Sequence, residues 1–360
     1  MRLKMDTINM QNPANNPNQF QPQPKPRKKM GCLVNGIIGV VVLFIILVII
    51  GSIFGEQPKD IDIYTGGKIE QIYVSGNHKS VNKIALIKVN GVIFSGVNSW
   101  DEMVNADSIA SQIYAAQSDP EVKAIILEIN SPGGEVSAAD KIYNFIQNFR
   151  KTKRPVIALF DSMAASGGYY IAAQTDWIVS GRLSITGSIG VIIDSIKYYD
   201  LLSKVGVQDE VYKTGEFKDL LNGGRPTTLG EKELLKNMIG ESYNIFVDIV
   251  SKGRISKNIK LTPEYIKTSE IGDGRVFSGQ EALQLGLVDQ IGYYSDALNK
   301  ALSLAKLHKD DVQIVMYEEK LSFSQILGRL MMNNFKMNLE IPGISRNSVT
   351  QPGNFYYLYR

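Results

Sequence analysis

The sequence is poor in the residues that build disulfide frameworks and transition-metal centres. Its 360 residues include one cysteine, Cys32, and two histidines, His78 and His308. A single cysteine cannot form a disulfide within the chain, and so few thiol and imidazole ligands do not support a transition-metal site. The chain also lacks the glycine-rich loops of nucleotide-binding proteins and the His-Glu-x-x-His motif of zinc proteases. We therefore expect neither a metal nor a cofactor.

The sequence also lacks a large excess of charge of either sign. The formal net charge is +3, which is too small to favour nucleic acid as a partner. The positive charge is instead local, because residues 1–30 carry six basic side chains against one acidic one. The rest of that segment is mainly Asn, Gln and Pro, so we expect a disordered, basic segment.

One long stretch has no charged residue at all, from Gly36 to Phe54. About 20 apolar residues are enough to cross a bilayer as a helix, so the stretch predicts a transmembrane helix over residues 33–55. A cleaved signal peptide is the alternative, but its apolar core would be about 7–15 residues long. The basic run "KPRKK" precedes the stretch, which predicts a cytoplasmic N-terminus and an extracytoplasmic remainder. Cys32 then lies at the cytoplasmic edge, either as an inert thiol or as an acylation site.

The remaining chain alternates between buried strands and amphipathic helices. The runs "KIALIKVNGVIF", "VKAIILEIN" and "PVIALF" are continuous apolar strands, and helical patterns separate them. This alternation predicts an α/β domain with much parallel sheet over residues 85–300, after a linker at 56–84. Thr228 and Glu231 form a capping box that begins a long helix ending near Arg254. Residues 301–360 form a C-terminal extension, and its end, "FYYLYR", is too aromatic for a disordered spacer, so we expect it to dock on some surface.

Two loops with small residues follow strands of this predicted sheet. In "NSPGG", Gly133 and Gly134 leave backbone N–H groups that suit an oxyanion or a phosphate, although an ordinary strand–turn–helix connection explains them too. In "AASGG", Ser166 lies between a strand and a helix, where a nucleophilic serine is exposed to substrate. Ser166 could instead be a simple helix N-cap, a role that Ser162 could also fill.

A nucleophilic serine needs a base, and neither histidine lies in a loop with the other signals. A lysine can do this work when burial favours its neutral form. Lys218 in "TGEFKD" is the candidate and Lys213 is its rival, while a solvated surface lysine is the ordinary interpretation. Thr186 and Ser188 in "ITGSIGV" are small hydroxyl residues that could hold a neutral lysine.

Five motifs taken in order resemble the signal peptide peptidase A family, the membrane-bound serine–lysine proteases of family S49. They are "INSPGG", "MAASGGYYIA", "ITGSIGVI", "TGEFKD" and "DGRVFSGQEALQLGLVDQIG", and the similarity covers about residues 85–300. The resemblance implies a Clp-protease/crotonase-like α/β fold with one catalytic domain per chain. It also implies that Ser166 is the nucleophile, Lys218 the general base, Gly133 the oxyanion-hole glycine and Ser188 the hydroxyl that orients the lysine.

In the short members that this chain resembles, the serine and lysine come from neighbouring subunits of a dome-like ring, an octamer by resemblance. The implied function is a membrane-anchored endopeptidase that cleaves remnant signal peptides and other unfolded or membrane-released segments outside the cytoplasm. The expected partners are peptides, the lipid bilayer and further copies of the chain. Two alternatives stay open at this point, a crotonase-like acyl-CoA enzyme and a catalytically silent scaffold that binds peptides.

Overall fold

The computed structural model describes residues 68–96, 103–320 and 356–358. The segments predicted to be a basic tail (1–30) and a transmembrane helix (33–55) lie outside these ranges. Among the residues that the structure describes, no helix is both long and apolar enough to cross a bilayer. All described residues belong to one compact unit of the chain, residues 59–360.

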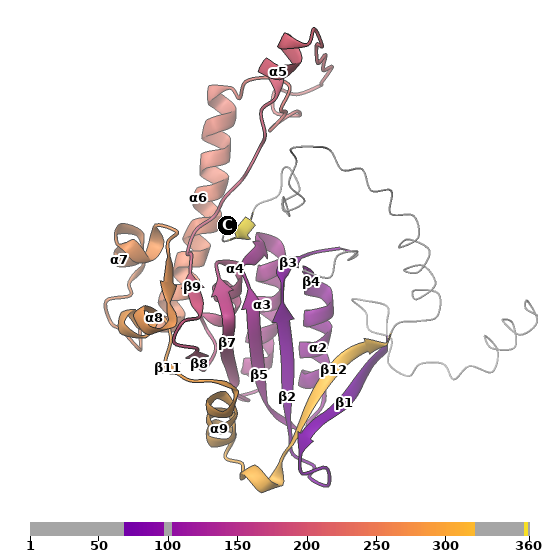
Figure 1. Ribbon diagram of the computed structural model, residues 1–360, viewed down its shortest axis with the longest axis vertical. Helices are drawn as coiled ribbons and strands as arrows, with labels where there is room; N and C mark the ends of the chain where they lie inside the picture. Colours follow the sequence, from indigo (N-terminus) through magenta and orange to yellow (C-terminus); the bar gives the residue numbers. More distant parts are fainter. Residues whose placement is uncertain (1–67, 97–102, 321–355, 359–360) are drawn as a thin grey trace, which may run out of the picture. The chain divides into compact units, whose positions relative to one another are not determined.

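A mixed, mainly parallel sheet organises this unit (Figure 1). Its strand order is β1-β12-β2-β5-β7-β8-β11, and β9 and β10 continue it beyond the end of β7. The pairs from β12 to β11 along this order are parallel, whereas β1 is antiparallel to β12. The bounds are β1 Lys68–Gly76, β2 Lys83–Asn90, β5 Val122–Ser131, β7 Val156–Ala165, β8 Trp177–Ser180, β9 Ile185–Gly187, β10 Val276–Ser278, β11 Gln290–Ile291 and β12 Gln313–Lys320.

The central strands are apolar on both faces because helices cover both faces. On one face, alternate residues of β2 and β5 pack against α2 (Ala106–Ser118) and α3 (Val136–Lys151). On the other face, the intervening residues, including Ile84, Ile126 and Ile157, pack against α9 (Tyr294–Ala305). The parallel α/β domain predicted from the continuous apolar runs is therefore confirmed.

A second, smaller sheet lies beyond the carboxyl ends of the central strands. Its order is β13-β6-β3-β4. The bounds are β3 Val92–Phe94, β4 Met103–Asn105, β6 Gly133–Glu135 and β13 Tyr356–Leu358. Because β6 contains the two glycines of the "NSPGG" loop, this sheet brings the C-terminal residues to one of the loops singled out in the sequence.

The long helix α6 (Leu229–Arg254) begins at the predicted Thr228–Glu231 capping box and ends as expected. The core residues of α6 lie toward its C-terminal end, from Phe246 to Arg254, and Glu231 is the buried residue near its start. The N-terminal half therefore projects from the domain. It carries the arm (residues 191–228), which includes α5 (Tyr199–Lys204), at the far end of α6 in Figure 1.

The remaining helices are short. Helix α4 (Gly167–Ala172) joins β7 to β8, and α7 (Pro263–Thr268), the 3-10 turn η1 (Glu270–Gly272) and α8 (Gly279–Leu285) lie between α6 and β11. The 3-10 turn η2 (Lys309–Asp311) precedes β12. Helix α8 ends at Gly286, which has a φ of 80°. Glycine favours this left-handed conformation at a helix end.

The structure differs from the sequence analysis at both borders of the domain. Strand β1 lies within the expected linker (56–84), and β12 lies within the expected C-terminal extension (301–360). These two strands pair with each other at the edge of the sheet. Strand β1 is largely exposed, and "KIEQIYVSG" holds an apolar run of only three residues, so it lacks the continuous apolar pattern of a buried strand.

Candidate active site

Ser166 occupies a sharp turn between β7 and α4. Its backbone has φ 52° and ψ −114°, a conformation that costs roughly 1–3 kcal/mol in a residue other than glycine. Two hydrogen bonds hold the turn: the Ser166 N–H donates to the Gly187 carbonyl at 2.8 Å, and the Ser166 carbonyl accepts from the Tyr170 N–H at 2.8 Å. This strand–turn–helix geometry is the structural context that a nucleophilic serine requires.

The Ser166 hydroxyl is buried and has no hydrogen-bond partner. The residue is 1% exposed, and its Oγ makes no hydrogen bond with the described residues. Ser166 occupies the N-cap position of α4, but its hydroxyl makes no capping hydrogen bond, so capping does not account for this serine. A buried hydroxyl without a partner costs about 1–3 kcal/mol, and a catalytic role, stored strain or a bound water can each account for such a group.

The small residues around Ser166 allow two loops to approach each other. A Cβ atom on Gly168 would lie 2.9 Å from the Ser131 carbonyl oxygen, closer than such contacts allow. Strand pairing also places Ala164 opposite Ser131. Gly168 thus allows the start of α4 to lie against the end of β5, where the "NSPGG" loop begins.

Gly133 adopts a φ of 104°, which favours glycine. Its N–H donates to the Ser131 Oγ at 3.1 Å. The expectation that this N–H is free was therefore wrong, because the serine two residues earlier satisfies it. A second N–H, that of Gly167 at the first position of α4, has no intrahelical acceptor, and none is found among the described residues. Gly167 was not singled out in the sequence, although it directly follows the serine.

Ser188 lies next to this turn because β9 pairs with the end of β7. Thr186 and Gly187 are opposite Ala164 and Ala165. The Thr186 hydroxyl donates to the Ala164 carbonyl at 2.7 Å and so has a structural role. The Ser188 hydroxyl makes no hydrogen bond with described residues, and Ser188 has a φ of 49° and is 6% exposed. Of the two hydroxyl groups considered for holding a lysine, that of Ser188 remains free.

Lys218 lies on the arm and is not brought to Ser166 within one chain. The ring of the preceding residue, Phe217, packs beside Gly230 at the start of α6. The other end of α6 meets α4, where Gly253 contacts the Ala173 carbonyl. From Gly230 to Gly253 the helix rises about 35 Å, whereas α4, which connects this end to Ser166, spans only about 10 Å. Lys218 and Ser166 of one chain are therefore separated by on the order of 20 Å.

The two candidate lysines differ in their partners. The Lys213 Nζ contacts the Asp219 carboxylate at 2.6 Å and the Glu216 carbonyl at 2.7 Å. Lys218 is exposed, and its ammonium group contacts no described residue. The Lys213 ammonium group is therefore already engaged within its own loop, whereas that of Lys218 is available to a surface that approaches it.

The two histidines lie at the opposite edge of the sheet. His78 stacks on Tyr73 beside the amino end of β2, and His308 is largely exposed next to β12. The serine turn is at the carboxyl end of the parallel strands, one strand length away, about 26 Å. Neither histidine can serve Ser166 in the same chain.

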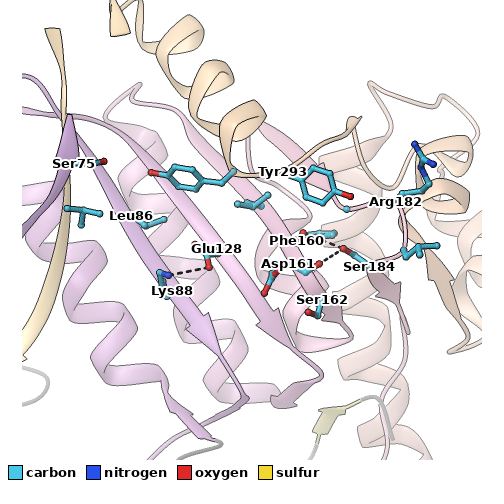
Figure 2. Close-up of a pocket in the computed structure, with 15 residues that line it drawn as sticks. Ser75, Leu86, Lys88, Glu128, Phe160, Asp161, Ser162, Arg182, Ser184 and Tyr293 are labelled. Atoms are coloured by element: carbon cyan, nitrogen blue, oxygen red, sulfur yellow. Dashed lines mark hydrogen bonds and ion pairs between the residues drawn. The ribbon is translucent and has the colours of Figure 1, made fainter. Parts of the chain in front are cut away.

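A hollow of about 750 Å³ lies on the α9 side of the sheet (Figure 2). An ion pair between Lys88 and Glu128 crosses its floor at 3.4 Å, and Asp161 and Tyr293 line its walls. Ser166 does not line this hollow. The chemistry described above therefore belongs to the turn between β7 and α4 and not to the hollow.

The predicted docking of the aromatic C-terminus is confirmed by β13. This strand pairs antiparallel with β6, placing Tyr357 opposite Gly134 and Leu358 opposite Gly133. It also lies against α3 and α4. The edge of β6 beside Ser166 therefore accepts an extended peptide backbone.

Comparisons with known proteins show the family of this chain. The model of Peptidase family S49 matches residues 148–308, and that of Clp protease matches residues 75–193. An Enterococcus faecium protein with the provisional name signal peptide peptidase SppA is 33% identical over 288 residues, which are 77% of this chain and 81% of that protein. The chain belongs to peptidase family S49.

This S49 peptidase is therefore a serine protease, and the parallel sheet agrees with a Clp-protease-like fold. A protease of Synechocystis, also named provisionally, is 38% identical over 237 residues, 66% of this chain and 79% of the relative. Protease 4 of Haemophilus influenzae is 36% identical over 230 residues, which are 64% of this chain but only 36% of that longer protein.

Proposed function

We propose that this S49 peptidase is a membrane-anchored endopeptidase with a Ser166–Lys218 dyad completed between neighbouring subunits. The observation that carries the proposal is the buried, unpartnered Ser166 hydroxyl on a strained turn. No base within the described part of the same chain reaches it. An exposed lysine on a projecting arm is available to a second copy.

The proposed reaction needs only groups of the protein and water. Neutral Lys218 accepts the Ser166 proton while the Oγ bonds to the substrate carbonyl carbon. The oxyanion accepts a hydrogen bond from the Gly167 N–H and a second one from the Gly133 N–H. The Gly133 N–H also donates to the Ser131 Oγ, so it is shared between the two acceptors. Protonated Lys218 gives its proton to the leaving amine, and water then hydrolyses the acyl-enzyme. One oxyanion donor contributes about 3–4 kcal/mol of transition-state stabilisation.

Ser188 is proposed to orient Lys218 when the arm of the neighbour arrives. Its free hydroxyl can accept from the ammonium and donate to the neutral amine. The closing of a neighbour over Ser166 and Ser188 would also exclude water, which favours the neutral lysine. The whole site would then form only in an oligomer. In a closed ring, each subunit receives the lysine of one neighbour and gives its own lysine to the other, so every site is complete.

The substrates are proposed to be extended, unfolded peptides, including remnant signal peptides released from the membrane. The pairing of β13 with β6 supports a groove that binds backbone rather than folded surfaces. The uncharged stretch from Gly36 to Phe54 supports a single anchor with the catalytic unit outside the cytoplasm.

Two other functions are less well supported. A crotonase-like acyl-CoA enzyme would need no free serine beside its oxyanion donors. A silent peptide-binding scaffold would need no strained, unpartnered hydroxyl. A serine-directed acylating probe at alkaline pH distinguishes the scaffold from the peptidase: mass spectrometry should find the label on Ser166. Absence of label from the assembled, full-length protein would favour the scaffold.

A further inference from the structure

The loop that carries Lys218 contains a dense set of ion pairs. Asp219, the next residue, accepts from the Arg225 Nε at 2.8 Å and from the Arg225 Nη2 at 2.7 Å. The Lys213 Nζ contacts the same carboxylate at 2.6 Å. The Asp219 side chain is 10% exposed, so these contacts are partly shielded from solvent. A two-pronged arginine–carboxylate pair fixes orientation as well as distance.

Arg225 links this loop to the first turn of α6. Its Nη1 donates to Glu231 Oε2 at 2.9 Å, and its Nη2 donates to Oε1 at 2.5 Å. Glu231, with a side chain 2% exposed, also accepts from the Thr228 N–H at 2.8 Å and completes the capping box of α6. The hydrogen bonds of Arg225 and Thr228 outweigh burial and lower the pKa of Glu231 to about 2. The carboxylate therefore stays charged at neutral and mildly acidic pH.

The backbone around Lys218 is fixed in the same way. The Lys218 N–H donates to the Gly215 carbonyl at 3.2 Å, and Leu220 N–H donates to the Phe217 carbonyl at 3.1 Å. The Phe217 ring lies 3.5 Å from where a Cβ on Gly230 would be, so the loop packs on α6. The backbone of Lys218 is thus held while its side chain projects without a partner among the described residues.

We propose that Lys213, Asp219, Arg225 and Glu231 form a clamp that positions Lys218 for proton transfer with Ser166 of a neighbouring subunit. The inference rests on the proposed function, because it concerns how the base is held. None of the four residues touches substrate, so all are positioning residues. An exposed arm without such a clamp would present its lysine in many positions, and a displacement of about 1 Å can lower a rate about 100-fold.

The clamp also balances charge beside the base. Lys213 and Arg225 are positive, and Asp219 and Glu231 are negative, so the four groups sum to zero. Glu216 is the other titratable group of this loop. An unbalanced negative charge beside Lys218 would favour its protonated form, and an unbalanced positive charge would favour the neutral form. The four clamp residues thus add no net charge beside the lysine, and the one net negative charge of the loop comes from Glu216.

This charge balance gives a signature that loss of stability cannot imitate. Arg225→Gln removes a positive charge, so the pH of half-maximal activity should rise; Asp219→Asn removes a negative charge, so it should fall. Both variants should lower kcat about 10- to 100-fold while KM changes little. Arg225→Lys keeps the charge without the fork, so it should restore the wild-type pH midpoint but only part of kcat.

Arg150→Ala is the matched control, because Arg150 pairs with Asp176 at 2.7 Å and is 29% exposed, against 27% for Arg225. It should leave both kcat and the pH midpoint unchanged. Hydrogen exchange provides a reading independent of activity: amides of residues 213–222 should exchange faster in Arg225→Gln than in the wild type, and those of β5 and β7 should not.

The experiment uses the full, assembled chain and measures peptide cleavage against pH for these variants and Lys218→Ala. If Arg225→Gln matches Arg150→Ala in kcat and pH midpoint, or if its loop exchange is unchanged, the clamp is overturned. If Lys218→Ala keeps wild-type activity, the dyad itself is wrong. If Lys218→Ala is inactive but Arg225→Gln keeps wild-type activity, only the clamp is overturned.

Discussion

The backbone N–H of Ser166 donates to the carbonyl oxygen of Gly187 at 2.8 Å. This bond fastens the serine turn to the end of β9, and the next residue along β9 is Ser188. Two residues with left-handed backbone, Ser166 and Ser188, therefore stand side by side at the carboxyl edge of the sheet. This hydrogen bond thus sets the place at which a proposed base could contact the hydroxyl groups of both Ser166 and Ser188.

Replacing Ser188 by Ala should lower kcat by roughly 10- to 100-fold and leave stability within about 0.5 kcal/mol, because its hydroxyl makes no hydrogen bond with the described residues. Thr186→Val makes the opposite change. It removes the bond to the Ala164 carbonyl and should cost about 1–3 kcal/mol of unfolding free energy. Peptide cleavage and denaturant unfolding of both proteins check the contrast. Equal kinetic and stability losses in the two variants would show that Ser188 has no special role.

Replacing Gly168 by Ala should displace α4, because the new Cβ would meet the Ser131 carbonyl oxygen at 2.9 Å. We expect a cost of about 1–3 kcal/mol in stability and a large loss of kcat, since the start of α4 sets the position of Ser166. Gly240→Ala in α6 is the control, because nothing lies within 4 Å of its Cβ position. It should stabilise the helix by about 0.5–1 kcal/mol and keep full activity. Normal kcat in Gly168→Ala would contradict this placement of the turn.

A chain that ends at Asn354 lacks β13 and should cleave peptides with a lower KM. The strand pairs with β6 opposite Gly133 and Gly134, so it occupies backbone that the proposed substrate groove provides. Steady-state kinetics on the truncated and full-length proteins measure the effect, with thermal unfolding as the control for folding. An unchanged or higher KM in a folded, truncated protein would place the substrate elsewhere.

Asp289→Asn should destabilise the domain by about 3–5 kcal/mol, because it leaves the fully buried Arg254 without its carboxylate. Burial raises the pKa of Asp289, but hydrogen bonds from Arg254 outweigh it and the net pKa lies below its usual value near 3.8. A lowered pKa means that this stabilisation is present above about pH 4 and is lost as the pH falls through the folded pKa. Unfolding free energy measured from pH 7 to pH 2 should show this loss in the wild type but not in Asp289→Asn.

Sequence patterns could predict the central sheet because its strands are apolar on both faces and its helices carry caps that bond locally. They favoured Lys218 over Lys213 without showing the contacts of either lysine, because Asp219 and Lys213 meet only when the arm folds. They also missed the Ser131 hydroxyl, which occupies the Gly133 N–H. Local signals identify which residues have suitable chemistry, whereas tertiary contacts decide which of them are free to use it.

The central claim is that Ser166 and Lys218 work together across a subunit boundary. Mixing separately inactive Ser166→Ala and Lys218→Ala proteins, followed by reassembly, tests it most directly. If each site takes its serine from one subunit and its lysine from the next, random mixing at equal amounts should restore about a quarter of the wild-type activity. A mixture that stays as inactive as its components, in assemblies shown to contain both variants, would contradict the shared dyad.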